Sequence, residues 1–224
     1  MNRNDVNIVT QRRDSVLSSH SVLRNTYLLL SLTFLFSAFT AYLSAAMGAP
    51  PVNILVMLVG VYGLMFLTQA LRNSPWGLVS VFAFTGFLGY TLGPLLNLYL
   101  AKYTNGPQLI GTALGGTGVI FFALSAYVLT TKKDFSFLGG FLFVGMMVAL
   151  LAMIAGIFFA IPALQLIVSA MFVMISSGLI LFQTSEIIHN GETNYISATV
   201  GLFVSIYNLF VSLLNLLSAF SGRD

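Results

Sequence analysis

Seven long apolar stretches occupy most of this chain and constrain its fold more than any other feature. The hydrocarbon core of a bilayer is about 30 Å thick, and a helix needs about 20 apolar residues to cross it. Charged residues make up only 7% of the 224 residues, whereas a water-soluble domain carries roughly 25%. The chain is therefore predicted to be an integral membrane protein. Its spans are expected at residues 25–47, 52–71, 76–100, 107–131, 135–160, 162–188 and 195–220.

Each span is predicted to be an α-helix, because lipid offers no partner to an unpaired backbone group. The strands of a membrane barrel would alternate in polarity, whereas these stretches are continuously apolar. Short links with turn residues, such as Pro50-Pro51 and Asn190-Gly191, predict that consecutive helices run antiparallel. The predicted fold class is all-α, with a seven-helix domain over residues 25–220 and a polar segment over residues 1–24.

Basic residues predict the orientation, because loops that carry more Lys and Arg stay in the cytoplasm. Seven lie on one side of the predicted membrane: Arg3, Arg12, Arg13, Arg24, Arg72, Lys132 and Lys133. Only Lys102 and Arg223 lie on the other side. We expect a cytoplasmic amino terminus and a periplasmic carboxyl terminus. Segment 1–24 has the composition of a flexible tail, and Arg12, Arg13 and Asp14 are its candidate partner-binding residues.

Small residues recur four positions apart in several spans. The pairs are Gly89 and Gly93, Gly111 and Gly115, Gly145 and Ala149, and Ala152 and Gly156. No hydrophobic force drives helices together inside lipid, so small residues that allow close backbone approach supply the contact. All four pairs are expected to pack helices together within the chain.

Polar residues gather on one face of each of the last two spans. The seventh span carries Gly201, Ser205, Asn208, Ser212 and Asn215 within one arc, and the sixth carries Ser169, Ser176 and Gln183, with Glu186 at its end. Polar side chains are costly in hydrocarbon, so the two faces are predicted to meet inside the bundle. Two interpretations stay open: hydrogen bonding between helices, or a hydrated path for an ion.

Signatures of catalysis are missing from the sequence. There is no cysteine, no phosphate-binding loop and no zinc-protease helix motif. Glu186, His189 and Glu192 are spaced so that they could approach a cation, but they flank an Asn-Gly turn and are expected to be solvated. We expect no enzyme activity, no cofactor and no bound metal.

Several motifs together resemble the transmembrane Bax inhibitor motif family. They are Gly77-Leu78-Val79-Ser80, then Gly89-x2-Leu92-Gly93-Pro94-x-Leu96, then Ala113-x3-Thr117-Gly118-Val119-Ile120-Phe121, and in the last third Leu181-Phe182-Gln183-Thr184 and Val204-Ser205-Ile206-Tyr207-Asn208-Leu209-Phe210. The family usually has Ala where Gly118 stands. With the seven spans, the resemblance covers nearly the whole chain.

The resemblance implies six helices around a central seventh, and two kinds of function. Bacterial members similar to this chain are regarded as modulators of FtsH, a membrane-anchored ATP-dependent protease that they bind and inhibit. Other members are regarded as pH-sensitive calcium leak channels gated by two aspartates. Those aspartates would fall at Gln183 and Ser205, which do not ionise near neutral pH, so the coupled proton switch is missing here. Asn208 and Arg72 match the family's pattern.

The predicted function is therefore an inner-membrane partner and inhibitor of FtsH, surrounded by membrane lipid and engaged as a slow substrate through its amino-terminal tail. The alternative is a pH-sensitive leak channel for calcium or another cation, or for protons, along the sixth and seventh helices. Its candidate polar interior comprises Arg72, Gln183, Glu186, Ser205, Asn208, Ser212 and Asn215.

Overall fold

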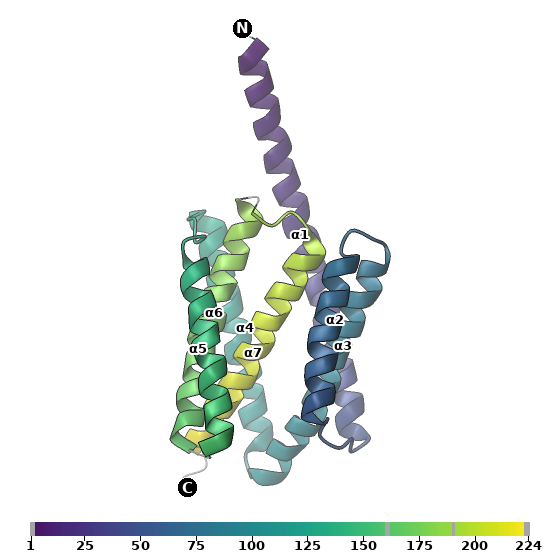
Figure 1. Cartoon of the computed structure of the whole chain (residues 1–224), viewed down its shortest axis with the longest axis vertical. Coiled ribbons are helices and arrows are strands. Elements are labelled where there is room, and N and C mark those ends of the chain that lie inside the picture. Colours follow the sequence, from purple (N-terminus) through teal and green to yellow (C-terminus); the bar gives the residue numbers. More distant parts are fainter. Residues whose placement is uncertain (1–2, 160–161, 190, 222–224) are drawn as a thin grey trace.

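The computed structural model describes residues 3–159, 162–189 and 191–221, which form seven α-helices and no strand (Figure 1). The helices are α1 (Arg3–Ala46), α2 (Ile54–Leu71), α3 (Trp76–Lys102), α4 (Gly106–Thr131), α5 (Leu138–Phe159), α6 (Pro162–Ile188) and α7 (Tyr195–Ser221). Each is long and apolar enough to cross a membrane, and the apolar part of α1 begins at His20. The predicted all-α membrane fold is confirmed.

Helix α1 differs most from its predicted span. The sequence suggests a boundary near residue 24, whereas the helix runs through this point from Arg3 and projects beyond the other helices (Figure 1). Neither Pro nor Gly, the strongest helix breakers, occurs between residues 3 and 46. The side chains of Arg12, Arg13 and Asp14 lie outside the described residues, so their role stays a prediction.

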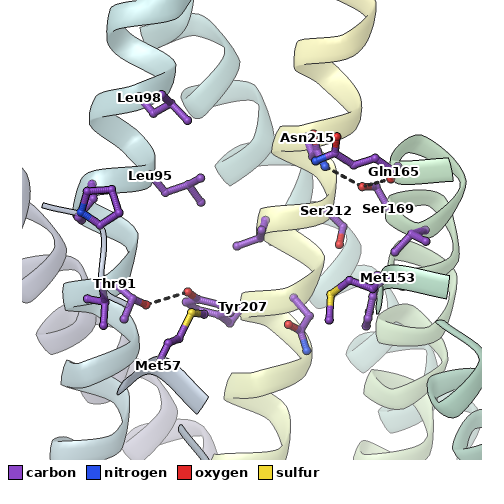
Figure 2. A pocket seen from close by; sticks show the side chains of 17 residues that line it. Met57, Thr91, Leu95, Leu98, Met153, Gln165, Ser169, Tyr207, Ser212 and Asn215 are labelled. Carbon is purple, nitrogen blue, oxygen red and sulfur yellow. Dashed lines mark hydrogen bonds between the residues drawn. The ribbon is translucent and has the colours of Figure 1, made fainter. Parts of the chain in front are cut away.

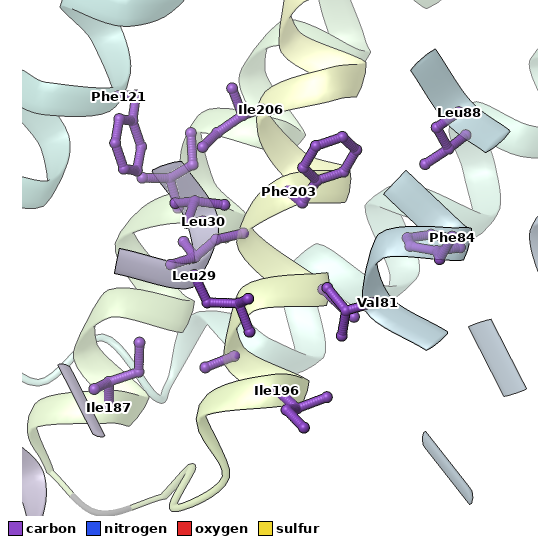
Figure 3. Close-up of a cluster of buried hydrophobic side chains, with 14 of the residues drawn as sticks. Leu29, Leu30, Val81, Phe84, Leu88, Phe121, Ile187, Ile196, Phe203 and Ile206 are labelled. Atoms are coloured by element: carbon purple, nitrogen blue, oxygen red, sulfur yellow. The ribbon is translucent and has the colours of Figure 1, made fainter. Parts of the chain in front are cut away.

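Helix α7 lies at the centre of the bundle. It contacts α1, α2, α3, α4 and α6, whereas α5 packs on α6 alone within the described residues. Figure 3 shows α7 side chains such as Phe203 and Ile206 among buried side chains from α1, α3 and α4. The phenyl rings of Phe34 and Phe203 stack there with their centroids 4.8 Å apart. The predicted central position of the seventh helix is confirmed, with α5 in an outer position.

Small residues bring α3 against α1, the most extensively packed pair of helices. A Cβ atom added at Gly93 would lie 2.6 Å from Ser44 Cβ and 2.7 Å from the backbone nitrogen of Ala45. At Gly89 the added atom would overlap the backbone oxygen of Ser37. The packing role predicted for these two glycines is confirmed.

The same prediction is wrong for α4. Nothing in the described structure lies within 4 Å of a Cβ added at Gly111 or Gly115. On α5, a Cβ at Gly145 would meet Ile175 at an ordinary 3.6 Å. Four-residue spacing puts two residues on one face of a helix, but it does not say whether that face meets a neighbour.

Candidate functional site: a polar interior along α7

The polar faces of α6 and α7 meet as predicted. Ser205 Oγ donates a hydrogen bond to Gln183 Oε1, at 3.2 Å, and also lies 3.1 Å from the backbone oxygen of Gly201. Nearer the other end, Asn215 Nδ2 donates to Ser169 Oγ at 2.9 Å. A Cβ at position 201 would come within 3.1 Å of Gln183 Nε2, so the glycine makes room for the amide. The two helices are therefore joined by hydrogen bonds at two levels.

A cavity of about 710 Å³ lies beside this seam. Residues of α2, α3, α5, α6 and α7 line it, and α2 and α5 do not touch each other in the described structure. Figure 2 shows Met57 of α2 and Met153 of α5 extending into the cavity from opposite sides. The cavity is therefore bordered by two helix pairs, α2–α3 and α5–α6, with α7 between them.

The α7 wall of the cavity is mostly polar, with Val211 as its one apolar residue. It carries Tyr207, Asn208, Ser212 and Asn215, and the Tyr207 hydroxyl lies 3.2 Å from Thr91 Oγ1 of α3 (Figure 2). The side chains of Asn208 and Ser212 form no hydrogen bond with the described part of the chain. They are thus available to water or to a ligand.

The cavity is confined to one half of the bundle. The basic end of the bundle carries Arg24, Arg72, Lys132 and Lys133, and the Lys102 end carries the links 47–53 and 103–105. The cavity lies toward the Lys102 end, and its deepest α7 residues are Tyr207 and Asn208. Ser205 and Gln183, which are joined by a hydrogen bond, lie nearer the basic end and do not line the cavity.

Arg72 lies at the basic end, away from the cavity. Its Nη1 donates to Ser197 Oγ in the first turn of α7, at 3.4 Å, and Ser197 donates to Gln69 Oε1 at 3.0 Å. Asn194 caps α7 by accepting from the backbone nitrogen of Ile196 at 2.9 Å, and it donates to the backbone oxygen of Arg72 at 3.1 Å. These bonds tie the α2–α3 link to the start of α7.

Glu186 also lies at the basic end, near the end of α6. Its carboxylate occupies the space where a side chain at position 191 would stand. His189 Nδ1 lies 2.9 Å from the backbone oxygen of Ser185, and Glu192 Oε1 accepts from the backbone nitrogen of Asn194 at 2.8 Å. Among the described residues, no three His, Asp or Glu side chains are grouped to hold a metal ion.

A buried serine holds the α4–α5 link against α6. Ser185 Oγ accepts from the backbone nitrogen of Phe135 at 2.9 Å. In the same link, Asp134 Oδ1 accepts from the backbone nitrogen of Ser136 at 2.8 Å. This hydrogen bond is the main cause that lowers the pKa of Asp134 below its ordinary value. These two hydrogen bonds fix the backbone of the α4–α5 link, which also carries Lys132 and Lys133.

The structure divides the predicted polar interior into three groups. Asn208, Ser212 and Asn215 line the cavity, Gln183 and Ser205 pair beyond it, and Arg72 and Glu186 lie at the basic end. The sequence did not single out Thr91, Gln165 or Tyr207 as lining residues. Their helices come together only in the folded bundle, and an isolated polar residue in an apolar span carries no periodic signal.

A family model described as "Inhibitor of apoptosis-promoting Bax1" matches residues 19–222. The chain belongs to the Bax inhibitor family. The match covers all of α2 to α7 and the apolar part of α1. The family resemblance read from the motifs is thereby confirmed.

Several bacterial members of the Bax inhibitor family are close relatives. The chain is 59% identical over 212 residues, 95% of both chains, to the protein named Modulator of FtsH protease YccA of Escherichia coli K12. It is 54% identical to an uncharacterized protein of Pasteurella multocida, over 97% of this chain and 98% of the other. An uncharacterized membrane protein of Vibrio cholerae is 44% identical over 96% of both.

Proposed function

We propose that this protein is an inner-membrane modulator of an FtsH-type protease, which it binds and inhibits. The observation that carries the proposal is the 59% identity, over 95% of both chains, to the relative named as a modulator of FtsH protease. A second relative with the same identity and coverage is named an inner membrane protein. Identity at about three residues in five, over nearly the full length of both chains, supports a shared seven-helix framework.

Two features of the chain support inhibition by slow degradation. Helix α1 projects beyond the bundle at the basic end, where a cytoplasmic enzyme would reach it (Figure 1). The same helix is held in the bundle against Gly89 and Gly93 of α3. A protease that pulls on the amino terminus would have to separate this close-packed pair, so it would be occupied for a long time.

Deleting residues 1–20 tests the proposal. The shortened chain keeps all seven apolar spans, except that the first span loses its first residue, His20. It also loses Arg12, Arg13 and Asp14. We expect its lifetime in cells to lengthen several-fold, and its capacity to slow FtsH degradation of another membrane substrate to fall. The measurements are a chase after synthesis is stopped and copurification with FtsH.

The matched control carries an unrelated polar segment of the same length in place of residues 1–20. If a tail of any sequence suffices, this control restores rapid turnover, and if the native tail is recognised, it does not. A lifetime that changes neither with the deletion nor with loss of the protease would contradict the proposal.

The second candidate function is a cation leak along α6 and α7. One observation favours it: the cavity reaches Asn208 near the middle of α7, and its α7 wall is mostly polar. In this candidate the hydrogen bond between Ser205 and Gln183 closes the path. The pair cannot act as a proton switch, because neither side chain ionises near neutral pH.

Flux into liposomes loaded with a calcium dye tests this candidate. We expect Asn208→Leu to reduce any flux several-fold, because it removes the polar group at the inner end of the cavity. Gln108→Leu, an exposed position on α4 outside the cavity, is the matched control and should leave the flux unchanged. Absence of flux between about pH 6 and pH 8, where a titrating gate would respond, argues for the modulator alone.

A further inference from the structure

A second cavity of about 500 Å³ adjoins the cavity beside α7 on its Lys102 side. The two share five lining residues: Leu95, Leu98, Gln165, Val211 and Asn215. The second cavity ends among Tyr99, Lys102 and Tyr103. We call the two together the α7 groove. Together they extend from the Lys102 end to Tyr207.

The length of the α7 groove matches one leaflet of a bilayer. Along α7 it extends from Ala219 to Tyr207, and twelve residues of α-helix rise about 18 Å. Half of the hydrocarbon core is about 15 Å thick. The groove therefore begins at the level of the lipid head groups and ends near the middle of the membrane.

The chemistry of the α7 groove changes along this length. At the mouth, Lys102 supplies a positive charge, and its ammonium lies 5.4 Å from the centre of the Tyr103 ring. The next level holds the amides of Gln165 and Asn215, and the Gln165 side chain has no hydrogen-bond partner among the described residues. Beyond them the walls opposite α7 are mostly apolar, with Leu95, Met153 and Phe172.

We propose that the α7 groove binds one phospholipid from the leaflet at the Lys102 end. The phosphate pairs with Lys102, an ester carbonyl oxygen accepts a hydrogen bond from Gln165, and one acyl chain lies between the α2–α3 and α5–α6 pairs. From its mouth inward, the groove presents a positive charge, then amides, then an apolar wall. A phospholipid presents its phosphate, its esters and its acyl chains in the same order. Since α2 and α5 do not touch in the part of the protein that the structure describes, the acyl chain enters sideways from the bilayer.

Polar groups at the inner end are compatible with this occupant. Asn208 and Ser212 both lie on the α7 wall, so water that enters with the lipid can hydrogen-bond to both and remain on that side. A bound lipid chain would fill the path that an ion needs. The proposal is independent of the protease partner, and it predicts little ion flux while the lipid is bound.

Photolabelling tests the lipid site. The full chain is reconstituted in vesicles of phosphatidylethanolamine and phosphatidylglycerol with a trace of phospholipid whose acyl chain ends in a diazirine. After illumination, the adducts are mapped by mass spectrometry. We expect label at Val168, which lines the groove and is only 7% exposed, at several times the level found at buried Ala113 and Ala149. Lipid at the outer surface of the bundle would label exposed side chains instead.

Three variants sharpen the result. Leu98→Trp narrows the neck that both cavities share and should cut the Val168 label several-fold. Leu100→Trp, an exposed leucine on the other side of α3, is the matched control and should not. Lys102→Glu should also lower the label, and equal labelling in this variant would overturn the phosphate contact. Label confined to exposed residues, or unaffected by Leu98→Trp in a protein that still elutes as folded, would overturn the proposal.

Discussion

Gly93→Leu is expected to abolish the folded bundle. Ser44 and the backbone of Ala45 already occupy the space that even a Cβ atom would need, and backbone cannot move aside as a flexible side chain can. Overpacking of a well-packed site costs about 1–3 kcal/mol for small additions, so we expect Gly93→Ala to be folded but clearly less stable. The measurement is the temperature at which the purified protein in detergent loses its monodisperse elution peak.

Gly115→Leu is the matched control for this prediction. Gly115 is also a glycine in a span at four-residue spacing from another glycine, but its added Cβ meets nothing within 4 Å in the described structure. We expect wild-type thermal stability. Equal loss of stability in the two variants would mean that the leucine acts through the helix itself and not through the contact between α1 and α3.

Phe203→Ala is expected to produce the second large loss of stability. Phe203 is 1% exposed at the centre of the bundle and stacks on Phe34. In a water-soluble core such a truncation costs about 3–5 kcal/mol, part of it for the cavity that is left. Because lipid is as apolar as the protein interior, mainly the packing part remains here, so we expect a loss no larger than the lower end of that range, about 3 kcal/mol.

Phe141→Ala on α5 is the comparison for Phe203. This side chain is 75% exposed on the outside of the bundle, where lipid chains can fill the space that the ring leaves. We expect its thermal stability to stay close to that of the wild type in the same detergent. A loss as large as that of Phe203→Ala would contradict the outer position of α5.

The close agreement between predicted and observed spans has a simple cause. Whether a segment enters hydrocarbon depends on its own summed apolar content and length, so the bounds of α2, α3 and α4 lie within a few residues of those expected. Polar residues in a span likewise indicate which face of the helix points into the bundle. They are costly in lipid, so the stripe on α7 pointed inward and toward α6, where Ser205 meets Gln183 and Asn215 meets Ser169.

The sequence predicted only part of the candidate site correctly. Asn208, Ser212 and Asn215 were expected in a polar interior and line the groove, but Arg72 and Glu186 lie at the basic end, where Arg72 donates to Ser197. Membership of a family motif says that a residue matches a pattern. It does not say which level of the membrane the residue occupies in this chain.

The sequence alone determined the number of spans, their helical character, the family and the polar seam of α6 and α7. Only the tertiary structure decided which apolar faces meet protein. Within the described residues, Gly93 lies against α1 but Gly115 has no neighbour, Phe203 is buried but Phe141 is exposed, and α5 packs on α6 alone. The physical reason is that lipid and a packed helix are equally apolar surroundings. The type of an apolar side chain therefore does not indicate whether it faces lipid or another helix. Shape complementarity decides this when the seven helices pack.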